Sequence, residues 1–408
     1  MSTAATTNTT PPNTTAASTT GAANLPLWGL LALSTAAFTA VMTQLLPAGL
    51  LPQMGGSLHV SEARVGFLVS VYAVASFGAA IPLTAALRGL PRRPVLIGVL
   101  TGLALCNAVT AVSASYPLTL LARLLAGAMD GTLWAMLAGY AARMVAAERR
   151  GRAIAIVLAG ITVALCLGIP LATAVATTIG WRTSFAALAA LAVVLVAWVR
   201  WKVPNLPGDV AAERVPLRRV AALPGIPTVL AVTMLLLLGH QAMYTYLAPL
   251  AERAGLGHPS LVLFVFGMAT VAGIGIVATL IDRHLRPTLL GALALVATAM
   301  LAMGLLGHTS TVLLLAVAGW GAGFGGAPTL LQTALVDAAS PGNANLATAM
   351  QTTVYNAGIA AGSLAGGIVL ERASAGALPW TALPLVVAAL VTVTAARRHA
   401  FPTHRPSH

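Results

Sequence analysis

The sequence is short of charged residues, and acidic residues are the scarcest of them. Only 9 of its 408 residues are Asp or Glu, against 22 Lys and Arg, and charged residues make up 8% of the chain. Soluble domains carry about 25% charged residues, so this composition excludes an ordinary soluble fold. The hydrophobic fraction of 58% agrees, since hydrocarbon must surround most of the chain.

Cysteine and recognisable catalytic motifs are scarce as well. Cys106 and Cys166 both fall in long apolar stretches, so we expect two reduced packing residues and no disulfide. The glycine run 321–326 lacks the strand and turn of a dinucleotide site, and no phosphate-binding lysine loop is present. No pair of stretches offers a metal cluster or a nucleophile with its base. We therefore expect no cofactor, no metal and no enzymatic activity.

Long hydrophobic runs dominate what is present. Twelve of them approach the length of about 20 residues that a helix needs to cross a bilayer. They cover residues 27–51, 63–87, 93–113, 117–143, 151–176, 182–201, 226–250, 259–281, 287–307, 310–336, 344–370 and 377–396. The predicted fold class is therefore an all-α membrane protein with twelve transmembrane helices.

Basic residues alternate along this series of spans. Arg64, Arg182, Arg253 and Arg372 fall in one set of gaps, Arg123 lies within a span, and the remaining 17 Lys and Arg fall in the other set or in the tails. Positive charge holds loops on the cytoplasmic side, which predicts that both termini are cytoplasmic. Orientation and contact with anionic lipid also account for the net charge of +13, so we expect no nucleic-acid partner.

The chain divides into five parts. Residues 1–24 are uncharged and rich in Thr, Ala, Asn and Pro, which predicts a disordered cytoplasmic tail. No basic segment precedes the first span, so we expect no cleaved signal peptide. Residues 202–225 contain four prolines and separate a six-span half, 25–201, from a second half, 226–396. Residues 397–408 form a basic cytoplasmic tail.

A weak internal repeat supports the two halves. The segment 85–98, which contains Arg92 and Arg93 before a proline, is echoed by 278–291, which contains Asp282 and Arg283. Each copy lies between the second and third spans of its half. Repeated halves of this kind are typical of transporters whose central site lies near the midplane.

Several short motifs carry a family resemblance across residues 25 to 396. They are Gly49-Leu-Leu-Pro52, Arg123 with Gly127, Gly168-Ile-Pro170, Gly180-Trp-Arg182 and Tyr244-Thr-Tyr246-Leu-Ala-Pro249. With the six-plus-six arrangement, the chain resembles the major facilitator superfamily, in its drug:proton antiporter branch near the arabinose-efflux-like and chloramphenicol-resistance exporters. The resemblance implies two pseudo-symmetric six-helix halves that alternate in access. It also implies conformational or gating roles for Arg92, Arg93, Gly168, Pro170, Asp282 and Arg283.

The sequence departs from the family pattern at three positions. The first basic loop keeps Arg92 and Arg93 but lacks the acidic residue, which is present only in the second copy as Asp282. Ala172 replaces a glycine after the proline of span five. Gln44 stands in span one where relatives often carry a glutamate, so a coupling carboxylate is absent from that place.

Asp130 is the only acidic residue well inside a predicted span. A carboxylate at that depth is costly unless it faces water or a partner, which makes Asp130 the first candidate for proton coupling. Helical spacing places Arg123, Gly127, Asp130 and Trp134 on one stripe, which we expect to line the cavity. Arg123 and Asp130 lie about 10 Å apart along the axis, too far for close contact unless the helix bends or a water molecule bridges them. The alternatives are helix anchoring for Asp130 and a structural carbonyl bond for Arg123.

Other polar and aromatic residues are candidates for substrate or proton contacts. His240 can titrate near neutral pH and is the third proton-coupling candidate, with hydrogen-bonded packing as the alternative. Polar groups facing lipid are costly, and aromatic rings suit amphiphilic ligands. The expected substrate-binding residues are Gln44, Trp134, Gln241, Tyr244 and Asn356, with helix packing as the alternative role.

Together these features predict a secondary active transporter in the inner (plasma) membrane. We expect it to export a small amphiphile, such as an amphenicol-like drug, a sugar or a nucleoside, in exchange for protons. An uncoupled facilitator or importer of a small neutral solute is the alternative, because Gln44 replaces the usual carboxylate. The expected partners are the substrate, protons and the lipid bilayer, and we expect a monomer.

Overall fold

The computed structural model describes residues 25–87, 89–146, 149–208, 221–339 and 344–396. The predicted tails and residues 209–220 of the predicted linker lie outside this range. So do the side chains of Asp282 and Arg283, both of which we expected to serve in gating.

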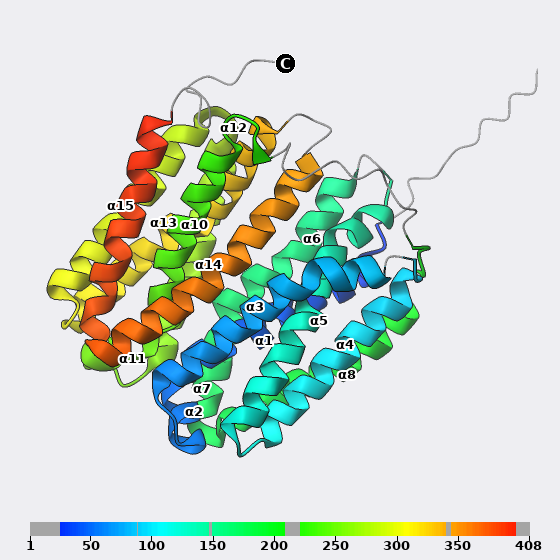
Figure 1. Ribbon diagram of the computed structural model, residues 1–408, viewed down its shortest axis with the longest axis horizontal. Helices are drawn as coiled ribbons and strands as arrows, with labels where there is room; N and C mark the ends of the chain where they lie inside the picture. The colour runs from blue at the N-terminus through cyan, green and yellow to red at the C-terminus, as the bar shows by residue number, and fades with distance from the viewer. Residues whose placement is uncertain (1–24, 88, 147–148, 209–220, 340–343, 397–408) are drawn as a thin grey trace, which may run out of the picture.

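The described residues form two helical bundles (Figure 1). The first contains α1 (Leu27–Gly49), α2 (Leu51–Leu58), α3 (Glu62–Leu87), α4 (Arg92–Val112), α5 (Tyr116–Arg143), α6 (Arg150–Val163), the π-helical turn η2 (Ala164–Gly168), α7 (Ile169–Ile179) and α8 (Trp181–Lys202). The second contains α10 (Ile226–Tyr244), α11 (Leu247–Arg253), α12 (Pro259–Leu306), α13 (Ser310–Ala338), α14 (Ala344–Arg372), the 3-10 turn η4 (Ala375–Ala377) and α15 (Leu378–Ala395).

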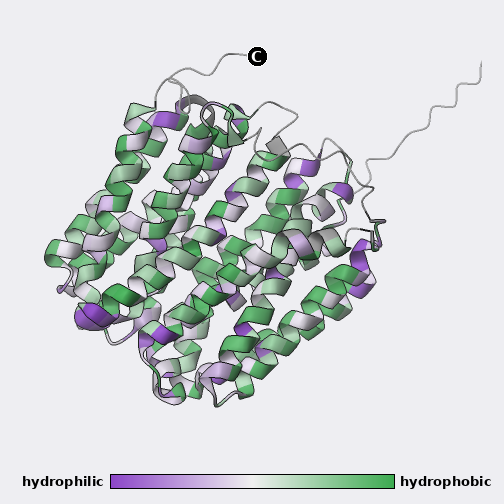
Figure 2. Cartoon of the chain, in the orientation of Figure 1, coloured by the Kyte–Doolittle hydropathy of each residue, from purple (hydrophilic) through white to green (hydrophobic). Residues whose placement is uncertain are grey.

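Within the described ranges, twelve helical stretches are long and apolar enough to cross a membrane, and no strand is present. This confirms the predicted fold class. Hydrophobic residues predominate along the helices (Figure 2), as expected of a bundle surrounded by lipid. The fifth span is longer than predicted, Arg150–Ile179, because η2 joins α6 to α7 without ending the helix. The eighth and ninth spans share α12, which is interrupted at His284, where φ is −134°.

Glycines in α5 allow the backbones of α5 and α3 to come into direct contact. A Cβ added at Gly127 would lie 2.2 Å from the carbonyl oxygen of Tyr72, and one at Gly131 would lie 2.1 Å from that of Ser76. Neither position has room for a methyl group. Small residues at this spacing are a usual means of close packing between membrane helices.

The second half repeats this contact between α13 and α12. A Cβ at Gly321 would meet the carbonyl oxygen of Phe266 at 2.5 Å, and one at Gly325 would meet that of Thr270 at 2.3 Å. The two glycines have the same four-residue spacing as their counterparts in α5. The internal repeat therefore extends beyond the loops to the packing of the helices.

The halves meet at the end of the molecule away from the linker. The Ser61 hydroxyl, just before α3, donates to Glu371 Oε1 in the last turn of α14 over 2.7 Å. Closer to mid-span, Cys166 Sγ in η2 donates to the carbonyl oxygen of Gly267 in α12 over 3.0 Å. Figure 1 shows α3 and α14 passing beside one another, in agreement with their many contacts. These contacts close the end opposite to the linker.

The glycine contacts predict that Gly131→Ala destabilises the protein, because the added methyl group would collide with backbone. Overpacking of this kind costs about 1–3 kcal/mol. The measurement is thermal unfolding of the purified protein in detergent. Gly139→Ala is the matched control, since Gly139 lies in the same helix with nothing within 4 Å of its Cβ position. Equal unfolding temperatures for the two variants would contradict the packing described.

Candidate substrate and proton-coupling site

Arg123 lies wholly inside the first half, with 1% of its surface exposed. Its Nη1 donates to the carbonyl oxygen of Thr43 and its Nη2 to that of Gln44, the latter over 3.0 Å. Its guanidinium carbon also lies 4.5 Å from the centre of the Tyr72 ring. The planar fork of arginine thus ties α5 to two consecutive carbonyls of α1 and to an aromatic face of α3.

The Thr43 carbonyl is available although it belongs to a helix, because Pro47 lies within α1. Proline has no N–H to donate to the carbonyl four residues earlier, here that of Thr43. Asn107 of α4 adds a hydrogen bond from Nδ2 to the Thr43 hydroxyl over 3.0 Å. Three helices therefore converge on the segment 43–44.

Asp130 lies two turns further along α5 and is fully buried. Its Oδ2 accepts a hydrogen bond from the Ser76 hydroxyl of α3 over 3.0 Å, while Oδ1 has no hydrogen-bond partner. Tyr72 and Trp134 lie near the carboxyl group. Arg123 uses both terminal nitrogens on α1, so the two buried charges form no direct ion pair.

The expected stripe on α5 is present but does not line an open cavity along its length. Arg123, Gly127 and Asp130 pack against α1 and α3, because the two glycines bring α3 so close. Trp134, at the end of the stripe, is only partly buried and packs against two hydrophobic clusters, one confined to the first half and one that contains residues of both halves. Asp130 is therefore buried within the protein, and a single hydrogen bond offsets part of the free energy needed to remove its carboxyl group from water.

His240 lies in an aromatic cluster of the second half, composed of His240 and Tyr244 of α10, Phe266 of α12, and Trp320 and Phe324 of α13. The imidazole stacks on the Phe324 ring with centroids 3.5 Å apart and planes inclined by 2°. The Trp320 ring meets it edge-on at 5.2 Å. Two polar atoms in this cluster, His240 Nδ1 and Trp320 Nε1, are buried without a hydrogen-bond partner.

The remaining expected substrate contacts are dispersed. Gln241 donates from Nε2 to the Thr245 hydroxyl over 3.0 Å, and that hydroxyl pairs with Ser363 of α14 at 2.8 Å. Gln44 is buried, and its Nε2 has no partner. Asn356 is partly buried, and its Nδ2 donates to the Thr352 carbonyl of its own helix over 3.3 Å. The structure therefore joins Tyr244 with His240 but leaves Asn356 apart from both.

The expected gating residues fall in two places. The backbone N–H of Arg92 donates to the Leu206 carbonyl over 2.8 Å, and Arg93 Nη1 donates to the Arg200 carbonyl over 3.4 Å. These contacts join the start of α4 to the last turn of α8 and to the segment that follows it. They lie within the first half and do not cross between the halves.

Gly168 and Pro170 lie instead at the centre of the molecule. Gly168 ends η2, and a Cβ there would lie 2.5 Å from the Met42 sulfur of α1. A π-helical turn within an α-helix often marks a functional site. Here the turn presents Cys166 to the second half, so this motif lies where the two halves touch.

Sequence reasoning missed several members of these clusters. Tyr72 and Ser76 lie one helical turn apart in span two, which was a usable signal because polar groups in a span need partners. Asn107 is the only amide in its span and could have been noticed for the same reason. Phe266, Trp320 and Phe324 had no such signal, since aromatic residues are common in apolar helices.

The fold and these buried groups define a class: a multi-pass membrane transporter composed of two pseudo-symmetric helical halves. The family model of the Major Facilitator Superfamily matches residues 33–363. The chain belongs to the Major Facilitator Superfamily, as its motifs suggested.

Proteins of known name are similar in sequence to this chain over most of its length. It is 32% identical to the "Chloramphenicol resistance protein" of Streptomyces lividans, across 94% of this chain and 98% of that protein. It is 31% identical to "Inner membrane transport protein YdhP" of Escherichia coli (strain K12), across 84% and 88%. The solved structure of the nucleoside transporter NupG has a TM-score of 0.74 at 15% identity, covering 91% of this chain and 100% of NupG, which shows the shared fold.

The geometry of Arg123 predicts a loss of stability in Arg123→Lys. One ammonium group cannot hold two consecutive carbonyls as the guanidinium does, and an unsatisfied buried acceptor costs about 1–3 kcal/mol. Thermal unfolding in detergent is the measurement. Arg182→Lys is the control, because Arg182 makes a single hydrogen bond, from Nη2 to the Ser113 carbonyl over 2.9 Å, which lysine can replace. A destabilisation of Arg182→Lys as large as that of Arg123→Lys would contradict this account.

Proposed function

We propose that this transporter exports a small amphiphilic molecule in exchange for protons, by alternating access of its two halves. The observation that carries the proposal is the state of Asp130: a fully buried carboxyl group with one hydrogen bond and no ion-pair partner. Acidic groups within membrane helices are rare and are usually retained for function. Relatives named for efflux, such as "Purine ribonucleoside efflux pump NepI" of Escherichia coli (strain UTI89 / UPEC), support the direction of transport.

In this proposal Asp130 carries the proton. With the halves in contact at the linker-distal end, Asp130 is enclosed by α3, and a charge there would have the Ser76 hydroxyl as a hydrogen-bond donor but no ion-pair partner. The protonated acid is the form that this enclosure tolerates. Separation of α3 from α5 would admit water to the carboxyl group and allow the proton to leave. Arg123 then acts as a positioning residue, because its bonds to Thr43 and Gln44 tie α1 to the helix that carries Asp130.

The second half supplies the substrate surface in this proposal. Its aromatic cluster offers ring faces together with two unpartnered polar atoms, His240 Nδ1 and Trp320 Nε1. Such a surface suits a neutral or weakly basic amphiphile that carries a ring and hydrogen-bonding groups. Amphenicol-like drugs, sugars and nucleosides meet this description. We propose Tyr244, Gln44, Trp134, Gln241 and Asn356 as further contacts, some of them made only in the outward-open state.

The second candidate function is uncoupled transport of a small neutral solute, in either direction. The observation that favours it is Gln44, which replaces a carboxylate in the first span and lies beside Arg123. We further propose placement in the inner membrane as a monomer with both termini cytoplasmic, on the basis of the distribution of basic residues.

The direct test is substrate-induced proton movement in proteoliposomes, with a panel of amphenicols, sugars and nucleosides. We expect the wild type to move protons with at least one ligand and Asp130→Asn to move none, because the amide cannot release a proton. Asp337→Asn is the control, since Asp337 is an exposed carboxylate near the end of α13. Ligand flux without proton movement in the wild type would favour the uncoupled function.

A second test separates the two titratable candidates. His240→Phe keeps a flat ring against Phe324 but cannot bind a proton. If Asp130 carries the proton and His240 contacts substrate, the variant retains the ratio of protons to substrate while its apparent substrate affinity falls about tenfold, which corresponds to the loss of one hydrogen bond. The measurement is paired flux of substrate and protons. A changed proton ratio with unchanged affinity would instead assign proton coupling to His240.

A further inference from the structure

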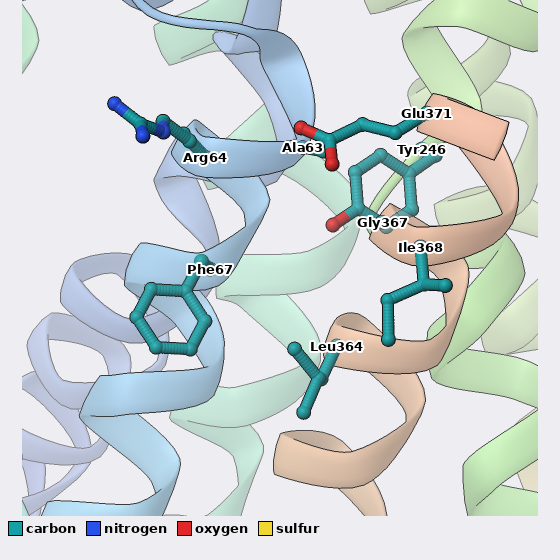
Figure 3. A pocket seen from close by; sticks show the side chains of 8 residues that line it. All are labelled: Ala63, Arg64, Phe67, Tyr246, Leu364, Gly367, Ile368 and Glu371. Carbon is teal, nitrogen blue, oxygen red and sulfur yellow. The ribbon is translucent and has the colours of Figure 1, made fainter.

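A groove runs between α3 and α14 at the end where the halves are closed (Figure 3). It has a volume of about 180 Å³ and is bounded by Arg64 and Phe67 of α3, by Tyr246 between α10 and α11, and by Leu364, Ile368 and Glu371 of α14. One wall therefore comes from each half. None of the substrate or proton candidates belongs to it.

The lower part of the groove is apolar and open to the membrane. Phe67, Leu364 and Ile368 are 37%, 45% and 44% exposed. These three side chains belong to helices that span the bilayer, so the surroundings they face are lipid chains. The groove is thus accessible from the side of the protein, through the membrane.

The upper edge of the groove carries two opposite charges that do not pair. The structure gives the Arg64 guanidinium no hydrogen-bond or ion-pair partner among the described side chains. Glu371 accepts one hydrogen bond at Oε1, from Ser61, and has no described partner at Oε2. Figure 3 shows Glu371 reaching from α14 toward α3 above Tyr246, while Arg64 points outward from the α3 side.

The charges lie at the depth of lipid headgroups. Arg64 is in the first turn of α3 and Glu371 in the last turn of α14, so both are at the ends of their spans. One turn deeper, both walls become apolar. The groove therefore offers a cation and an anion at its edge and an apolar surface below them. This arrangement is complementary to a phospholipid whose headgroup carries a phosphate and an ammonium group.

We propose that this groove binds one phospholipid with a primary amine headgroup, as in phosphatidylethanolamine. The phosphate meets Arg64, the ammonium donates to Glu371, and one acyl chain lies along Phe67, Leu364 and Ile368. Because the two charged residues belong to different halves, the bound lipid bridges them. It therefore stabilises the conformation that is closed at the linker-distal end.

The test is competitive lipid retention, measured by native mass spectrometry after reconstitution in equal amounts of phosphatidylethanolamine, phosphatidylcholine and phosphatidylglycerol with identical chains. The trimethylated amine of phosphatidylcholine cannot donate a hydrogen bond to Glu371. We expect the wild type to retain phosphatidylethanolamine about tenfold more than phosphatidylcholine, the change expected from one charge-assisted hydrogen bond.

Variants assign the preference to the groove. Glu371→Gln should abolish it, and Arg64→Gln should lower retention of both lipids because both carry the phosphate. Arg372→Gln should change neither, because Arg372 is exposed at the same end but does not border the groove. Equal retention of phosphatidylethanolamine and phosphatidylcholine by the wild type overturns the proposal without reference to any variant. A preference for phosphatidylglycerol, a preference that survives Glu371→Gln, or unchanged lipid retention in Arg64→Gln also overturns it.

Discussion

The close approach of α3 and α5 at Gly127 and Gly131 determines the environment of everything else in the first half. It leaves no room for a methyl group at either glycine, and beside them the Asp130 carboxyl group is enclosed against the Ser76 hydroxyl. It also places the Tyr72 ring over the guanidinium of Arg123. Separation of these helices would change the surroundings of both charges at once, which is how a helix movement can be linked to a proton.

The two halves share a packing pattern but differ in chemistry. Position 324 precedes Gly325 as position 130 precedes Gly131, so Phe324 occupies in the second half the place of Asp130 in the first. Where the first half has a carboxyl group and a serine hydroxyl, the second has a phenyl ring stacked on His240. The same scaffold therefore presents a titratable group on one side and an aromatic surface on the other. The proposed division between proton coupling and substrate contact rests on this asymmetry.

Much of the fold could be predicted because each transmembrane helix is determined by the residues of its own segment. Each span needs only its own run of apolar residues, and the basic loops repeat between halves, so the twelve helices followed from the sequence. The candidate site was only partly predictable. Asp130 and Arg123 stood out because charge is rare in a span, but their partners come from α1 and α3, which hydropathy cannot align with α5. The stacking of His240 on Phe324 depends on the rotation of two helices and had no signal in either one.

We propose that the free energy of a proton gradient drives the substrate through this protein, with Asp130 as the linking group. The most direct measurement is the substrate gradient that wild-type proteoliposomes sustain under an imposed pH difference, alongside Asp130→Asn. The account predicts that the wild type concentrates substrate against its gradient and that the variant only equilibrates it. A wild type that never exceeds equal concentrations on both sides, at any pH difference, would contradict the account.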